Sequence, residues 1–110
     1  MSAASDADDG PAAGGAPRGN AVMLTVEIVN KLGLHSRPAA KFAAMAETFD
    51  AAVLVSARGG EPIDGSSILD LLMLGAGQGS ILSIEATGPE AGAAVDALAS
   101  LVESGFGEGE

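Results

Sequence analysis

Residues 22–49 read VMLTVEIVNKLGLHSRPAAKFAAMAETF, and the spacing of the apolar residues changes within this stretch. Over 22–29 apolar residues alternate with other residues, which is typical of a half-buried strand. After the NKLG turn, the alanine-rich segment 36–49 repeats apolar residues at helical spacing, at Ala39, Phe42, Ala46 and Phe49. Pro38 suits the first helical turn, where its missing N–H is no loss. This stretch therefore predicts a strand, a turn and a helix, with His35 just ahead of the helix.

The rest of the chain predicts further strands and helices in alternation. We expect strands at 51–57, 61–64 and 80–87, and helices at 67–74 and from 89 to about 104. Pro62 suits an edge strand, and either Ser66 or Ser67 can cap the short helix. The order β-α-β-β-α-β-α predicts an α+β fold, an open-faced two-layer sandwich with a four-stranded antiparallel sheet and three helices on one face.

Length and composition favour one folded domain between two unstructured ends. The chain has 110 residues, of which 47% are hydrophobic, enough for a single modest core. Residues 1–20 form an acidic segment rich in Ala and Gly that we expect to be a disordered tail. The domain is expected over 21–105, and residues 106–110 to be frayed, although Phe106 could pack back onto the domain.

Charge and residue usage exclude several classes of function. The net charge of −10 repels nucleic-acid phosphates, so we expect no nucleic-acid partner. No apolar run is long enough to insert into a membrane, and no secretory signal is present, so we expect a cytoplasmic protein. With one histidine and no cysteine, neither a metal site nor a bound cofactor is expected.

The single histidine lies where a helix is expected to begin. A helix N-terminus carries about half a positive charge and presents unpaired N–H groups, so it stabilises a nearby anion. Arg37 would add a guanidinium, and a neutral imidazole nitrogen is a nucleophile, which favours group carriage by His35. A histidine that merely caps the helix remains an alternative. The glycine-rich run LGAGQGS, 74–80, lacks a Walker lysine and is interpreted as a turn.

The segment GLHSRPAAKF, 33–42, resembles the active-site segment of the HPr phosphocarrier proteins of the bacterial phosphoenolpyruvate-dependent phosphotransferase system. The likeness extends from about Val22 to Val102 and includes DGSSILDLLMLGAGQGS, 64–80. It implies an HPr-like fold and a phosphoryl carrier rather than an enzyme. His35 would accept phosphate on Nδ1 from phosphorylated enzyme I and give it to an enzyme IIA component, with Arg37 holding the phosphoryl oxygens.

The resemblance also implies a second, regulatory site. Ser67 aligns with a serine that an HPr kinase/phosphorylase modifies in some members, and Ser66 is the less favoured choice. An alternative function is thus a regulatory protein-binding module controlled by phosphorylation of Ser67; a domain that binds a small molecule has less support. We expect a monomer that docks its partners through Ile68, Leu69, Leu72 and Lys41. The first three belong to the short helix at 67–74, which is apolar nearly all round, so some of its apolar side chains should be exposed.

Overall fold

The computed structural model describes residues 21–107, so the expected tail at 1–20 and the last residues 108–110 lie outside the described part. The predicted order of strands and helices is found. The elements are β1 (Val22–Glu27), α1 (Ser36–Glu47), β2 (Ala52–Ala57), β3 (Ile63–Asp64), α2 (Ile68–Met73), β4 (Ile81–Thr87), α3 (Ala91–Glu103) and a final 3-10 turn, η2 (Gly105–Gly107).

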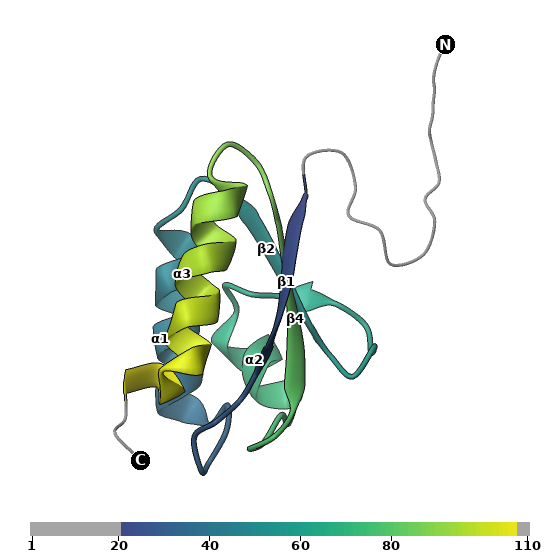
Figure 1. Ribbon diagram of the computed structural model, residues 1–110, viewed down its shortest axis with the longest axis vertical. Helices are drawn as coiled ribbons and strands as arrows, with labels where there is room; N and C mark the ends of the chain where they lie inside the picture. The colour runs from purple at the N-terminus through teal and green to yellow at the C-terminus, as the bar shows by residue number, and fades with distance from the viewer. Residues whose placement is uncertain (1–20, 108–110) are drawn as a thin grey trace.

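The four strands form one antiparallel sheet in the order β1-β4-β2-β3. Figure 1 shows α1 and α3 side by side on one side of this sheet, with α2 near the end at which α1 begins. The prediction of an open-faced α+β sandwich is therefore confirmed. The third strand is shorter than expected, because Glu61 and Pro62 lie ahead of its first paired residue, Ile63.

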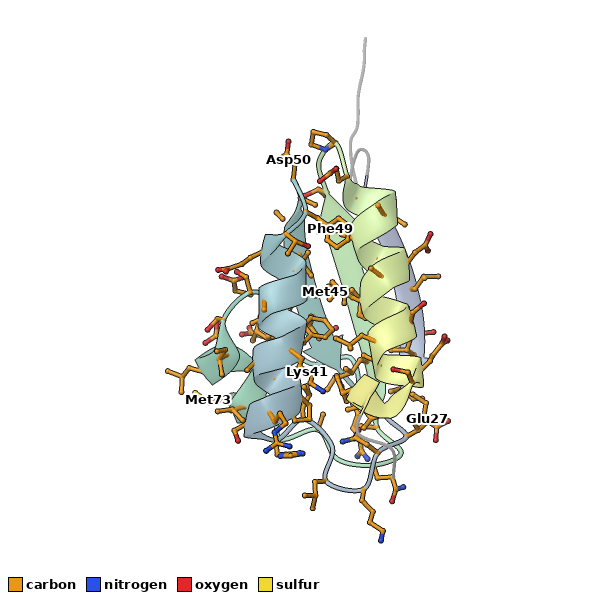
Figure 2. All side chains as sticks on the ribbon, turned by 90° about the vertical axis from the view of Figure 1, so that its left-hand side faces the viewer. Glu27, Lys41, Met45, Phe49, Asp50 and Met73 are labelled. Atoms are coloured by element: carbon orange, nitrogen blue, oxygen red, sulfur yellow. The ribbon has the colours of Figure 1, made fainter. Side chains whose placement is uncertain are left out.

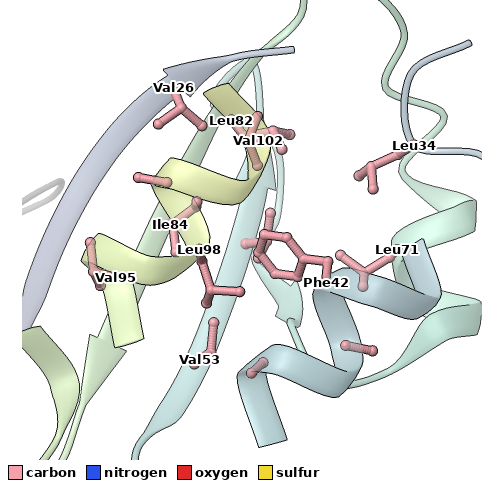
Figure 3. Close-up of a cluster of buried hydrophobic side chains, with 14 of the residues drawn as sticks. Val26, Leu34, Phe42, Val53, Leu71, Leu82, Ile84, Val95, Leu98 and Val102 are labelled. Carbon is pink, nitrogen blue, oxygen red and sulfur yellow. The ribbon is translucent and has the colours of Figure 1, made fainter. Parts of the chain in front are cut away.

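The core lies between the sheet and the helices. Phe42 of α1 and Leu98 of α3 are fully buried and point into a cluster of buried side chains that includes Ile84 of β4 (Figure 3). Val55 of β2 is also fully buried. The alternation predicted for the fourth strand is found, since Leu82, Ile84 and Ala86 are buried. On the edge strand β1, Leu24 pairs with Ile84 and is 40% exposed, whereas Val26 pairs with Leu82 and is 5% exposed.

The packed part of the chain extends past the boundary expected at residue 105. Phe106 is fully buried within η2, and η2 packs against both α3 and α1. The sequence predicts a frayed end over 106–110 while allowing Phe106 to pack back, and in the structure Phe106 does pack back. The buried ring of Phe106 adds apolar surface to the core, which its neighbours Gly105 and Gly107 cannot do because they have no side chain.

Two loops at one end of the sheet are joined through their backbones. Ile28 N–H donates to Ser80 O (2.9 Å), Gly79 N–H donates to Ile28 O (2.8 Å), and Leu34 N–H donates to Ala76 O (3.0 Å). Gly33 has φ +66°, and a Cβ there would clash with the Ala76 carbonyl and lie 2.6 Å from Gly77 Cα. The glycine-rich segment is thus a turn, as interpreted, and it holds the loop that leads to His35.

This close approach predicts different costs for two glycine-to-alanine variants. Gly75 has a similar φ, +63°, but a Cβ there meets nothing within 4 Å. Gly75→Ala should cost about 1–2 kcal/mol, the penalty of a left-handed residue. Gly33→Ala should cost a further 1–3 kcal/mol or so, because the backbone must also move. Urea unfolding of both variants measures the difference; equal losses would contradict the close approach.

Candidate functional site

His35 is the N-cap residue of α1, but its ring does not act as the cap. Its backbone is extended (φ −80°, ψ −171°), and its carbonyl accepts the first helical hydrogen bond, from Ala39 N–H at 2.9 Å. The side chain makes no capping hydrogen bond to the helix. The imidazole is half-buried at the helix end. Capping alone therefore does not explain a histidine here.

The first turn of α1 is arranged to favour an anion. The amides of Ser36 and Arg37 have no carbonyl partner within the helix, because they belong to its first turn. Pro38 is buried and lacks an N–H to satisfy. No acidic residue occupies this turn, residues 36–39, so no carboxylate of the turn competes for the positive helix end. Arg37 is exposed and adds a guanidinium directly after Ser36.

The loop ahead of His35 is fixed by a buried asparagine. Asn30 is 1% exposed, and its Nδ2 donates a hydrogen bond of 2.9 Å to Gly33 O. Leu34 is buried in the core and hydrogen-bonded to Ala76 O. His35 therefore directly follows Leu34, whose side chain is fixed by packing in the core and whose backbone is fixed by a hydrogen bond.

The two serines ahead of α2 have different partners. Ser67 is the N-cap, because its Oγ accepts a hydrogen bond from Asp70 N–H at 3.1 Å. Ser66 contacts Asp64 instead: its N–H and its Oγ–H both donate to Asp64 Oδ1, at 2.9 and 2.7 Å. These two hydrogen bonds, the backbone one first, hold the pKa of Asp64 below its ordinary value. The choice of cap that the sequence left open falls on Ser67.

Helix α2 exposes an apolar surface, which we call the α2 patch. It consists of Ile68, Leu69, Leu72 and Met73, exposed to 45%, 65%, 37% and 74%. Leu71 alone is fully buried in this helix. Met73, on the outer side of α2 (Figure 2), was missed by sequence reasoning. A helix of six residues that buries only Leu71 fully leaves its remaining apolar side chains exposed, and the apolar run in the sequence already indicated this.

Lys41 has a partner within its own chain. Its Nζ donates a hydrogen bond of 2.7 Å to the carbonyl of Phe106. Figure 2 shows Lys41 on the side of α1 that faces α3, whereas Met73 lies on α2. The sequence could not reveal this contact, because 65 positions separate the two residues. The expected docking role of Lys41 stays a prediction.

Two negative findings apply to residues 21–107, the part that the structure describes. Within it, no group of three or more His, Cys, Asp or Glu side chains is placed to hold a metal ion. None of its helices is both long and apolar enough to span a bilayer.

Comparison with known proteins identifies the class to which this fold and site belong. Residues 22–104 match the family model PTS-HPr, described as the PTS HPr component phosphorylation site. The chain is 46% identical over 83 residues to phosphocarrier protein HPr of Cupriavidus necator, covering 76% of this chain and 92% of the relative. It is 44% identical over 87 residues to phosphocarrier protein NPr of Escherichia coli K12, covering 79% and 97%.

Solved structures of known proteins share the fold of this chain. The fold matches HPr-C-His from Thermoanaerobacter tengcongensis with a TM-score of 0.76 at 37% identity, covering 81% of this chain and 99% of that one. It matches an HPr from Bacillus anthracis with a TM-score of 0.72 at 33% identity, covering 76% and 99%. The chain belongs to the HPr family. Its function is that of a phosphoryl carrier in the phosphotransferase system, and it is not itself an enzyme.

Ser66 and Ser67 give a matched pair of variants. Ser66→Ala should raise the pKa of Asp64 toward its ordinary value, because one of two hydrogen bonds to the carboxylate is lost. A carboxyl group whose pKa is lower in the folded than in the unfolded state stabilises the fold at pH values above its unfolded-state pKa. This contribution is lost as the pH falls through the folded-state pKa. Ser66→Ala reduces the contribution of Asp64, so the variant should lose less stability than the wild type on acidification.

Ser67→Ala should leave the Asp64 pKa unchanged and cost about 1 kcal/mol, the usual value of an N-cap. Carboxyl-carbon NMR titration and urea unfolding measure the two effects. An Asp64 pKa that moves in Ser67→Ala and not in Ser66→Ala would contradict the assignment of the two hydrogen-bond sets.

Proposed function

We propose that His35 is the phosphoryl acceptor of this carrier. Its Nδ1 receives the phosphoryl group from phosphorylated enzyme I and later gives it to an enzyme IIA component. In the first step a bond forms between Nδ1 and phosphorus while the donor's bond to phosphorus breaks. Attack through Nδ1 requires its lone pair, so the single ring proton of the neutral imidazole is then carried by Nε2.

The observation that carries this proposal is the position of the imidazole at a helix end that its ring does not cap. A phosphoryl group on this ring would lie beside the first-turn amides of α1, where no carboxylate of residues 36–39 opposes it. Arg37 would contact the phosphoryl oxygens. Ser36 and Arg37 are both exposed, which leaves this end of the helix open to a partner.

The strength of this stabilisation suits a carrier. A helix end favours an exposed anion by about 0.3–1 kcal/mol, and a charge-assisted contact from an exposed arginine adds a comparable amount. A carrier that bound its phosphoryl group several kcal/mol more tightly would pass it on slowly, because the stabilisation would be lost on transfer. A weak, solvent-open site therefore fits reversible transfer better than a buried one.

The α2 patch is proposed as the docking surface for both partners. The loop after α2 is bonded to the His35 loop through Ala76 and Leu34, and Met73 is three positions before Ala76. A partner seated on Leu69 and Leu72 would therefore cover the end of the molecule that carries His35. Apolar side chains exposed to this degree on one short helix are typical of interaction sites.

Ser67 is proposed as a regulatory phosphorylation site for an HPr kinase/phosphorylase. A phosphate there would add about −1.5 to −2 charges at the edge of the α2 patch, beside Asp70 in the same helical turn. It would also convert Ser67 Oγ, which accepts from Asp70 N–H, into a bridging ester oxygen and add three phosphate oxygens as further acceptors. We also propose that the protein acts as a monomer in the cytoplasm, where a relay that begins with phosphoenolpyruvate operates.

The acceptor is tested by incubating the chain with phosphoenolpyruvate and enzyme I and recording phosphorus NMR. We expect an acid-labile, alkali-stable phosphohistidine signal that is absent in His35→Ala and present in the control Ser67→Ala. Loss should be complete, because the chain has one histidine. Phosphohistidine-like phosphate in His35→Ala would refute the assignment.

Docking is tested with two exposed leucines. Leu69→Ser should raise the KM for phosphorylation by enzyme I about tenfold at unchanged kcat, as expected for a contact worth about 1.4 kcal/mol. Leu54→Ser is the matched control, because Leu54 is 40% exposed on the open face of the sheet. Steady-state kinetics distinguish the two, and an equal rise of KM in both variants would exclude the α2 patch as the specific surface.

A further inference from the structure

The final turn η2 has an unusual backbone. Gly105, Phe106 and Gly107 all have positive φ angles, +70°, +59° and +69°. For a phenylalanine this left-handed conformation is unfavourable and persists only where the surroundings impose it. Phe106 is nevertheless fully buried, so the packing of its ring holds the backbone in this conformation.

One side of η2 contacts helix α1. The Phe106 carbonyl accepts the hydrogen bond from Lys41 Nζ at 2.7 Å. Lys41 lies six positions after His35 on the helix whose first turn would bind the phosphoryl group. Lys41 has an exposed side chain, yet its charged end is fixed on the C-terminal turn.

The other side of η2 contacts the loop ahead of His35. A side chain at position 105 would meet Asn30 Cβ at 3.7 Å and Val29 Cγ2 at 3.8 Å, so the Gly105 backbone lies directly beside these residues. Asn30 in turn holds the Gly33 carbonyl, two positions before His35. The C-terminal turn therefore bridges the loop that ends at His35 and the helix that begins after it.

We propose that η2 is a latch that positions His35 against the first turn of α1, with Phe106 and Lys41 as positioning residues. This inference rests on the proposed role of His35 as acceptor. Anion stabilisation by a helix end falls off within one turn, and displacement of a reacting group by about 1 Å can cost up to 100-fold in rate. A loosened latch would thus slow phosphoryl transfer without changing the α2 patch that binds the partner.

The proposal makes Lys41 a positioning residue rather than a docking charge, and kinetics separate these roles. In the full-length protein, Lys41→Met should lower kcat for phosphorylation by enzyme I about 5- to 10-fold, with KM changed less than about twofold. Lys41→Arg keeps a donor for the Phe106 carbonyl and should restore at least half of kcat. Lys31→Met removes an exposed positive charge from the His35 loop and is the control for electrostatics.

A double-mutant cycle tests the link to the C-terminal turn. Phe106→Leu should lower kcat in the same way as Lys41→Met, and the double variant should be no slower than the slower single variant, because both loosen one element. Thermal unfolding ensures that the rates are measured on folded protein. The latch would be overturned if the kcat losses of Lys41→Met and Phe106→Leu multiplied in the double variant. It would also be overturned if Lys41→Met raised KM alone, or if Lys41→Met and Lys31→Met lowered kcat equally.

Imidazole NMR of the unphosphorylated protein keeps this result independent of the acceptor assignment. The His35 ring signals should shift or broaden in Lys41→Met and in Phe106→Leu, and return to their wild-type positions in Lys41→Arg. Unchanged signals in both loosened variants would refute the latch. If His35 proved not to be phosphorylated while its ring signals still responded, the acceptor assignment would fail and the latch would stand.

Discussion

Position 33 requires glycine, because its left-handed backbone passes against the Ala76 carbonyl and lies close to Gly77. This approach lets Leu34 bond to Ala76 and brings the segment after β1 against the segment after α2. The site depends on it in two ways. His35 is delivered to the start of α1 by a loop that cannot slide, and the α2 patch is kept at the same end of the molecule. The loop that carries His35 and the segment after α2 are thus linked through backbone hydrogen bonds.

The charge of the protein is distributed so that this end differs from the rest. The chain carries a net charge of −10, yet the first turn of α1 has no acid and is followed by Lys41. Two acidic side chains elsewhere accept hydrogen bonds: Asp64 from Ser66, and Glu90 from Asp50 N–H at 2.7 Å. A phosphoryl group would therefore find a positive helix end on an otherwise anionic molecule. If His35 is the acceptor as proposed, this contrast would favour the phosphoryl group at the start of α1.

Much of this arrangement could be predicted from the sequence. Alternating residues in β4 and helical spacing in α1 and α3 depend on short-range periodicity, and both were found in the expected places. The position of His35 at a helix start was predictable for the same reason. The sequence allows Phe106 to pack back, but its positive φ and the hydrogen bond from Lys41 to its carbonyl could not be predicted. The bond joins distant positions, and the φ opposes the local preference of phenylalanine. Strand order is likewise not contained in periodicity, so the alternation over 22–28 could not show that Leu24 is 40% exposed while Val26 is buried.

The strand order also has a consequence for the time at which the site forms. β1 pairs with β4, and the segment between β1 and His35 is hydrogen-bonded to residues 76–80. The strand and the turn that hold the His35 loop are thus both made later than His35 itself. During synthesis, a chain that ends before β4 contains His35 but lacks the strand and the turn that support it. Such long-range closures occur late and cooperatively in folding. An incomplete chain would therefore contain His35 without the strand and the turn that hold its loop in place, so the geometry that the proposed transfer needs would be complete only after β4 is made.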